Sequence, residues 1–344
     1  MSKSPRAVKA LELVRELQSL FVCGLEGVSA EVGEEILFED SSWLRDEGRH
    51  GGGSRFTAPI DREGCLFDRA SVNVSQIHYD DEPTKKLGSA TALSCIIHPA
   101  NAHASSIHMH ISWTEMKDGT GYWRMMADLN PSIPNPEQTA RFQECLRSVV
   151  GEFYEEGSAQ GDRYFYIPAL ERHRGASHFY LENFSSGDEV ADREMAKSLG
   201  MAVIESYLMF LKESIKANPT ISDSSAKAQL DYHTLYFFQV LTLDRGTTSG
   251  LLVHDQNDLG IMGSLPSHID KALLSSWRAK LPSPQEELLD DLLSALSDEV
   301  ISPVSDEVKL AVAKAVRNHY KKHPDAISLQ ASGNVVPPTV ANHR

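Results

Sequence analysis

The chain has few cysteines, no long apolar run and a shortage of positive charge. Its four cysteines, at positions 23, 65, 95 and 145, are widely spaced and form no CxxC pair, which argues against a disulfide framework or a cysteine-based zinc site. No apolar run approaches the roughly 18 to 20 residues that a membrane-spanning helix needs. The basic N-terminal segment has no continuous apolar stretch of the kind found in secretory signals. We therefore expect reduced thiols, no membrane span and a cytoplasmic location.

The charge balance bears on the partners of the protein. The chain has 33 Lys and Arg residues against 48 Asp and Glu residues, which gives a formal net charge of −15. Nucleic-acid binding depends on cations that neutralise phosphates, so we expect a small-molecule substrate and no nucleic acid. With 344 residues, of which 41% are hydrophobic, the chain is long enough to bury a sizeable core.

Histidine is concentrated in one region, since four of the 14 histidines lie between His98 and His110. An apolar run that ends at Ile97 predicts a strand with His98 at its end, where Pro99 stops the pairing. His108 and His110 lie two residues apart in the next predicted strand, so their side chains share a face. Imidazoles relay protons and bind metals near neutral pH, whereas a single histidine at a strand end is more often a hydrogen-bonded structural residue.

Hydrophobic periodicity predicts a mixture of helices and strands. Strands are expected at residues 71–79, 90–98, 107–115 and 121–129, and their succession indicates an antiparallel meander. Further strands are expected at residues 164–167, 178–184 and 231–243, the last followed by a tight turn at 244–247. Helices are expected at residues 5–24, 135–156, 188–217, 284–299 and 305–321.

The remaining segments define the expected domain organisation. Residues 45–55 form a charged, glycine-rich loop that lacks the spacing of a nucleotide-binding fingerprint, so a flexible hinge is favoured over an anion site. Residues 1–30 are expected to form an N-terminal helix, 31–270 a catalytic domain and 271–323 a set of C-terminal helices. The small, polar residues 324–344, with prolines at 337 and 338, are expected to be disordered.

Several segments, taken in order, resemble the oxygen-dependent coproporphyrinogen III oxidases. The resemblance extends from about residue 51 to residue 266. The matching segments are GGGSR at 51–55, VNVSQIH at 72–78, SCIIHP at 94–99 with His108 beyond it, DLNP at 128–131, YFY at 164–166, RG at 174–175, LDRGTTSGL at 243–251 and SLP at 264–266.

The resemblance implies a fold, a reaction and a set of site residues. The implied fold is α+β, with a large antiparallel sheet of about seven strands flanked by helices on both faces, in a homodimer. The implied reaction is the oxidative decarboxylation of two propionates to vinyl groups on a porphyrinogen, with molecular oxygen as co-substrate and no obligatory cofactor. The implied catalytic residues are His108, Asp244 and Arg245, and the implied substrate contacts are Ser94, His110, Arg55, Arg174 and Asp128.

The chain departs from the family pattern at several polar positions. Ser112 and the segment HDQN at 254–257 stand where the family has arginines, and Glu137 and Ala169 stand where it has histidines. A buried carboxylate without a cationic partner is costly. We therefore expect coproporphyrinogen III, which has four carboxylates, to bind poorly.

These departures keep two alternatives open. One is a metal-dependent oxygenase that acts on another small molecule, with iron or copper held by His108, His110 and a third ligand, which is His98, Glu137 or Asp128. The other is a catalytically silent homologue that binds a ligand.

Overall fold

The computed structural model describes residues 2–59, 65–254, 257–336 and 338–343. It divides into two compact units: the first consists of Met1–Asp162, Gly175–Pro219 and Gly333–Arg344, and the second of Arg163–Arg174 and Thr220–Ser332. This division differs from the expected boundaries at 30, 270 and 323, since both ends of the chain belong to the first unit. Within the described residues, no helix is both long enough and apolar enough to span a membrane.

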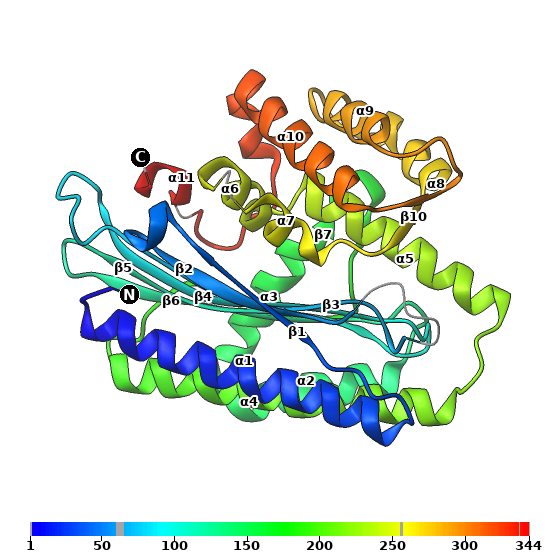
Figure 1. Cartoon of the computed structure of the whole chain (residues 1–344), viewed down its shortest axis with the longest axis horizontal. Coiled ribbons are helices and arrows are strands. Elements are labelled where there is room, and N and C mark those ends of the chain that lie inside the picture. Colours follow the sequence, from blue (N-terminus) through cyan, green and yellow to red (C-terminus); the bar gives the residue numbers. More distant parts are fainter. Residues whose placement is uncertain (1, 60–64, 255–256, 337, 344) are drawn as a thin grey trace. The chain divides into compact units, whose positions relative to one another are not determined.

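The first unit is built on a seven-stranded antiparallel sheet in the order β1-β2-β3-β4-β5-β6-β9 (Figure 1). The strands are β1 (Glu39–Leu44), β2 (Gly51–Thr57), β3 (Phe67–His78), β4 (Leu87–Pro99), β5 (Ser106–Met116), β6 (Gly121–Asn130) and β9 (Ser177–Phe184). The predicted meander and the predicted α+β class with a large antiparallel sheet are confirmed.

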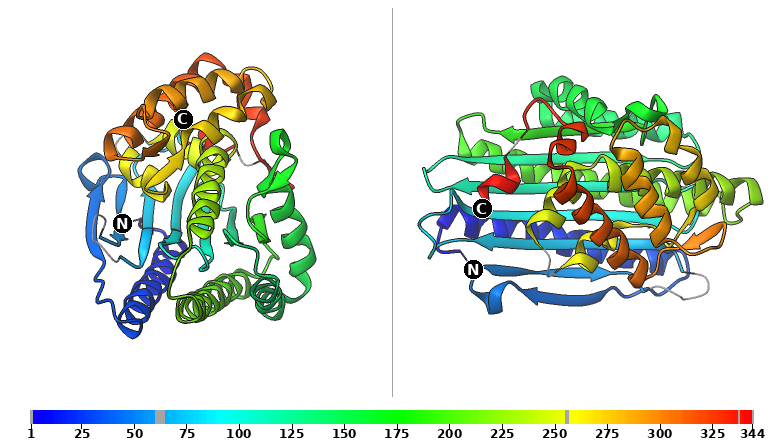
Figure 2. Two further views of the ribbon diagram at one scale, coloured as in Figure 1. Left: turned by 90° about the vertical axis from the view of Figure 1, so that its right-hand side faces the viewer. Right: turned by 90° about the horizontal axis from the view of Figure 1, so that it is seen from above.

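Three long helices cover one face of this sheet (Figure 2). They are α1 (Pro5–Glu31), α2 (Pro136–Val150) and α4 (Glu189–Ala217). Each has an N-cap residue, Ser4, Asn135 and Asp188 respectively, whose side chain accepts a backbone N–H of the first helical turn. Helix α1 continues beyond the predicted stop at Gly24. A Cβ at Gly24 would clash with Leu208 of α4, so glycine allows the two helices to approach closely here.

Alternate side chains of the strands separate into two faces. Leu93, Met109 and Met125 are fully buried and belong to the apolar core, which also includes α1 residues such as Leu17. The residues between them in sequence point to the opposite face, because side chains alternate along a strand. Since α1, α2 and α4 cover the first face, the polar side chains of these strands lie on the second face of the sheet.

Four shorter helical segments complete the first unit. They are η1 (Asp46–Gly48), η2 (Gly151–Phe153), α3 (Tyr154–Phe165), whose last three residues belong to the second unit, and α11 (Thr339–Asn342). The predicted strand at 164–167 is wrong for its first half, because α3 extends through Phe165.

The second unit is mainly helical. Its helices are α5 (Asp223–Thr242), α6 (Arg245–Val253), α7 (Asp258–Ile261), η4 (Met262–Ser264), α8 (Lys271–Ser276), η5 (Arg278–Lys280), α9 (Gln285–Ala295), α10 (Asp306–Lys322), η3 (Pro168–Leu170) and η6 (Pro324–Leu329). Two small antiparallel pairs accompany them: β7 (Tyr166–Ile167) with β8 (Arg172–His173), and β10 (His268–Asp270) with β11 (Ile301–Pro303).

The glycine-rich segment at 45–55 is a strand for half its length, so the predicted loop is wrong there. Residues Gly51–Thr57 form β2, paired on both sides. A Cβ at Gly53 would overlap the ring of Trp43, and Gly51 has a φ of +94°. The glycines are therefore required by close packing and by backbone conformation, which accounts for them without a hinge or an anion site.

The aromatic segment at 231–243 is helical, and the predicted strand and the tight turn after it are both wrong. It forms most of α5, in which Tyr236, Phe237 and Phe238 are buried. The next helix begins at Asp244, whose side chain accepts the backbone N–H of Thr247 as an N-cap. The apolar run is long because α5 is buried on several sides.

The described part of the C-terminal segment differs from the expected disorder. Helix η6 is followed by Gln330, which is buried and donates hydrogen bonds to Thr248 and Tyr320. At the end of the chain, Tyr79 contacts His343, and Lys85 donates to its carbonyl oxygen. Pro337 and Arg344 lie outside the described residues.

Candidate active site

The second face of the sheet carries a continuous row of side chains in register. Residues directly opposite one another on neighbouring strands share a face. One row crosses all seven strands and consists of Ser41, Arg55, Asn73, Ser94, His110, Met126 and Tyr180. The row beside it includes Ser71, Ile96, His108, Asp128 and His178. We call the surface formed by these two rows, with Ser112 and Arg124 of the next row, the polar face.

His108 has the most defined environment on the polar face. Its Nδ1 lies 3.2 Å from Oδ1 of Asp128, and the Asp128 side chain is completely buried. The other carboxylate oxygen of Asp128 accepts a 2.7 Å hydrogen bond from Nδ2 of Asn130. Because Asn130 holds the carboxylate in place, Asp128 orients the imidazole and favours a proton on Nδ1. This leaves Nε2 of His108 as the atom that can exchange a proton with a substrate.

A second histidine in the same row has a similar partner. His178 lies opposite Asp128 on β9, and its Nδ1 is 2.8 Å from Oδ1 of Asp162 on α3. Asp162 is half exposed, whereas Asp128 has no exposed surface. The two pairs therefore have the same chemistry in different dielectric surroundings, and the shorter separation belongs to the more exposed pair.

His110 lies one residue pair farther along β5, opposite Ser94 and Met126. Burial lowers the pKa of His110 well below its ordinary value, and the positive charges of Arg124 and His108 lower it further. At neutral pH this imidazole is therefore uncharged. Together with the Ser94 hydroxyl, it supplies a neutral donor and acceptor pair to the centre of the polar face.

Besides Arg55 on β2, the polar face carries Arg124 on β6. Ser112 lies directly opposite Arg124, whose Nε donates a 2.9 Å hydrogen bond to Oε1 of Glu182. Glu182 is buried and also accepts a hydrogen bond from the hydroxyl of Tyr180. The guanidinium therefore lies beside the position where the family pattern has an arginine, but its charge is balanced by a carboxylate.

His98 also lies toward the end of β4, but its surroundings are structural. It is completely buried, and its Nδ1 is 2.9 Å from Oγ of Ser106. Ser106 and His108 are two residues apart on β5, which separates them by about 6.8 Å. Among the described residues, the group that brings three potential ligand atoms within 4.8 Å of one another consists of His50, Asp81 and Glu82. The predicted metal site at His98, His108 and His110 stays a prediction.

Asp244, in the second unit, uses both carboxylate oxygens within that unit. Oδ1 accepts the backbone N–H of Thr247 at 2.6 Å, and Oδ2 accepts the hydroxyl of Tyr164 at 3.2 Å. The backbone N–H of Gly246 also donates to the Tyr164 hydroxyl. The backbone at the start of α6 therefore depends on a helix cap, and the predicted catalytic role of Asp244 together with His108 stays a prediction.

The two predicted arginines of the second unit have structural contacts there. Arg245 donates hydrogen bonds to the carbonyl oxygens of Ile327 and Ala331. Arg174 is completely buried, with its guanidinium 4.7 Å and 4.8 Å from the ring centroids of Phe165 and Tyr236. The predicted roles of Arg245 and Arg174 in catalysis and substrate binding stay predictions. In the segment at 254–257, Asp255 and Gln256 lie outside the described residues.

Sequence reasoning thus placed Arg55, Ser94, His108, His110 and Asp128 on what proves to be one face. It missed Asn130, the partner of Asp128, and the partners of three other polar side chains: Asp162 beside His178, Glu182 beside Arg124, and Tyr164 beside Asp244 in the second unit. Asn130 alone left a local signal, since it lies two residues from Asp128 on the same strand and thus on the same face. The other three partners come from distant parts of the chain.

Comparison with known proteins agrees with this arrangement. The chain matches the family described as coproporphyrinogen III oxidase over residues 9–296. It is 26% identical to an oxygen-dependent coproporphyrinogen-III oxidase of Prochlorococcus marinus over 330 residues, which covers 83% of this chain and 90% of that protein. It is 27% identical to the human mitochondrial oxygen-dependent coproporphyrinogen-III oxidase over 262 residues, which covers 69% of this chain and 56% of the human protein. A Drosophila melanogaster protein of the same name is 27% identical over 280 residues, with 74% of this chain and 69% of the relative covered.

The fold and the matches define the chain as an oxidoreductase of the kind that uses molecular oxygen, as the sequence predicted. More specifically, the chain belongs to the coproporphyrinogen III oxidase family.

Proposed function

We propose that this protein oxidatively decarboxylates propionate side chains of a porphyrinogen, with molecular oxygen as the oxidant and the polar face as the reaction surface. The observation that carries the proposal is the His108–Asp128–Asn130 arrangement, in which a buried carboxylate orients a histidine beside Ser94 and a neutral His110. Relatives named for the oxidation of coproporphyrinogen III support the choice of reaction.

The balance of the reaction indicates what the side chains must do. The CH2 next to the pyrrole loses a hydrogen with its two electrons, and the C–C bond to the carboxylate breaks. The electron pair of that bond forms the vinyl double bond as CO2 leaves, while oxygen takes up the two electrons and becomes hydrogen peroxide. Each vinyl group formed requires one further proton, and we assign its delivery to Nε2 of His108.

In this proposal, the other groups of the polar face bind and orient the porphyrinogen substrate. The Ser94 hydroxyl and neutral His110 contact the substrate through hydrogen bonds, because neither has a charge that would oppose a cationic, oxidised pyrrole. Arg55, half-buried on β2, is the candidate partner for one substrate carboxylate. Asp244, Arg245 and Arg174 keep their proposed roles in catalysis and substrate binding.

The substrate preference depends on Arg124. Since Ser112 provides no cation and Arg124 already pairs with Glu182, the polar face offers less positive charge to carboxylates than the family pattern. We therefore propose weak binding of coproporphyrinogen III. Glu182→Gln should remove the negative charge that balances Arg124 while the amide oxygen still accepts a hydrogen bond. The affinity for coproporphyrinogen III should therefore rise by roughly 5- to 20-fold. Anaerobic titration with the porphyrinogen measures this affinity. Unchanged or weaker binding by the variant would contradict a role for Arg124 in binding substrate carboxylates.

The role of His108 is tested by His108→Ala. Removal of a proton-transfer group typically costs about 10² to 10⁴ in rate, so vinyl formation should fall by that factor while the protein stays folded, because His108 is at the edge of the core. His178→Ala is the matched control: it removes the other carboxylate-paired histidine of the same row. Equal rates for His108→Ala and the wild type would assign His108 a structural role.

The remaining predictions concern assembly and location. A homodimer and a cytoplasmic location stay predictions. The aromatic segment at 231–243 gives no support to a dimer interface built on an exposed strand edge, because it forms most of the buried helix α5. Light scattering at micromolar concentration measures the oligomeric state.

A further inference from the structure

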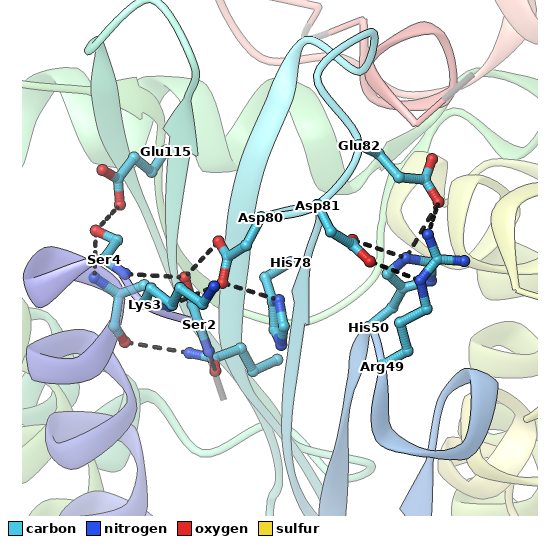
Figure 3. A network of polar contacts seen from close by, with 12 residues as sticks. Ser2, Lys3, Ser4, Arg49, His50, His78, Asp80, Asp81, Glu82 and Glu115 are labelled. Carbon is cyan, nitrogen blue, oxygen red and sulfur yellow. Dashed lines mark hydrogen bonds and ion pairs between the residues drawn. The ribbon is translucent and has the colours of Figure 1, made fainter.

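One corner of the first unit brings three potential metal ligands together from two turns (Figure 3). His50 lies between η1 and β2, whereas Asp81 and Glu82 follow β3 in the turn that leads to β4. The two turns are also joined by the backbone, since the N–H of His78 donates to the carbonyl oxygen of His50. These residues take no part in the proposed porphyrinogen chemistry.

The separations between the three donors suit a small cation. Nε2 of His50 is 3.1 Å from Oε1 of Glu82 and 3.6 Å from Oδ1 of Asp81. Nitrogen and oxygen ligands lie about 2.0–2.2 Å from zinc, so two ligands of a tetrahedral site are about 3.4 Å apart. The donors therefore already have the mutual spacing of a coordination shell.

The imidazole of His50 is prepared for this role by a fourth residue. Its Nδ1 is 2.5 Å from Oδ2 of Asp46. A proton on Nδ1 directs the lone pair of Nε2 toward Asp81 and Glu82, as in the carboxylate–histidine–metal arrangement of many metal sites. The His50 side chain is only 8% exposed, and its Nε2 is buried with no partner in hydrogen-bond geometry among the described residues.

The local charge also favours a cation. Three carboxylates, those of Asp46, Asp81 and Glu82, surround the imidazole. Among the described residues, Arg49 pairs with Asp81 and Glu82, and Arg45 interacts electrostatically with Asp46. Arg49 donates to Oδ2 of Asp81 at 2.6 Å. This holds the carboxylate in place and leaves Oδ1 directed toward His50.

We propose that Nε2 of His50, Oδ1 of Asp81 and Oε1 of Glu82 bind one divalent transition-metal ion. The mixed nitrogen and oxygen donor set suits Zn²⁺, Mn²⁺ or Fe²⁺ better than Mg²⁺ or Ca²⁺, which prefer oxygen ligands. Three protein ligands leave a further coordination position for water. The ion cross-links the turn before β2 to the turn after β3, so its effect on the protein is to stabilise this end of the sheet.

The proposal is tested by titration of the metal-free full chain with Zn²⁺, followed by calorimetry, with no porphyrinogen present. One ion should bind per chain. His50→Gln, Asp81→Asn and Glu82→Gln should each weaken the binding by at least tenfold, whereas Asp80→Asn, which alters the neighbouring carboxylate, should leave it unchanged. The carboxylates are partly exposed, so at least two of these variants should retain the fold, which circular dichroism verifies.

Co²⁺ provides an independent readout, because its visible absorption reports on its ligands. The wild type should give a ligand-field spectrum that His50→Gln alters. The absence of Zn²⁺ binding up to millimolar concentration, or binding that all three variants leave intact, would overturn the proposal. Loss of metal binding without loss of vinyl formation would leave the proposed function untouched, so the two proposals fail separately.

Discussion

Replacement of Asp128 by asparagine is the sharpest test of how the polar face works. The amide oxygen of an asparagine can accept the hydrogen bond that Asn130 now donates to Oδ2 of Asp128. The amide NH2 then faces Nδ1 of His108, where the carboxylate oxygen now lies at 3.2 Å. An N–H donor at this position requires Nδ1 to accept, so the proton of the neutral imidazole moves to Nε2.

The expected loss has two parts. The first is the loss of the carboxylate charge beside His108: an interaction with a charged group contributes about 1.5 to 3 kcal/mol, which corresponds to roughly a 10- to 150-fold lower rate. The wrong tautomer adds to this, so we expect kcat to fall by about 10² to 10⁴. KM and the free energy of unfolding should change little, because the shape of the side chain and its bond to Asn130 are preserved.

The assay is vinyl formation measured as a function of porphyrinogen concentration, together with ¹⁵N NMR of the imidazole tautomer. Asp162→Asn makes the same chemical change beside His178 and should leave kcat within about threefold of the wild type, since Asp162 is half exposed. A wild-type kcat in Asp128→Asn, or an equal loss in both variants, would refute the assignment of Asp128 as the residue that orients His108.

Two further predictions follow from caps and charges. Asp244→Ala should lower the free energy of unfolding by about 0.5 to 2 kcal/mol in urea titrations, because the cap of α6 is lost, whereas Asp244→Asn should retain it, since asparagine caps a helix as well as aspartate. Because the pKa of His110 is lowered, the unfolded chain binds a proton below about pH 6.5 that the folded chain does not, so stability should fall as the pH drops from 6.5. His110→Gln should make this fall shallower between pH 7.5 and 5.5, and an unchanged slope would contradict the buried, neutral state of His110.

The sequence predicted the polar face because strand geometry is local. A period of two residues places Ser94 on the same face as residue 96 and places His108 on the same face as His110. Antiparallel pairing in a meander then puts the two strands side by side. Nothing beyond short-range pattern was needed for this part of the site.

The predictions that were wrong or incomplete depend on contacts between residues that are distant in sequence. Residues 231–243 are aromatic and apolar enough for a strand, but a buried helix has the same composition, and periodicity does not separate the two. The three-histidine metal site stays a prediction, because residues that share a face need not converge, and Nδ1 of His98 lies 2.9 Å from Oγ of Ser106. Asp81 and Glu82 left no recognisable motif, because their approach to His50 depends on two turns that are distant in sequence.

The most direct test of the proposed function is a single experiment on the wild-type protein. The protein is loaded with coproporphyrinogen III under anaerobic conditions at a concentration that saturates even weak binding, and oxygen is then admitted. The account predicts products in which propionate has become vinyl, with CO2 and hydrogen peroxide released in equal amounts, and formation slower by about 10² to 10⁴ in His108→Ala. Porphyrinogen that is bound at saturation and is returned without vinyl groups after exposure to oxygen would contradict it.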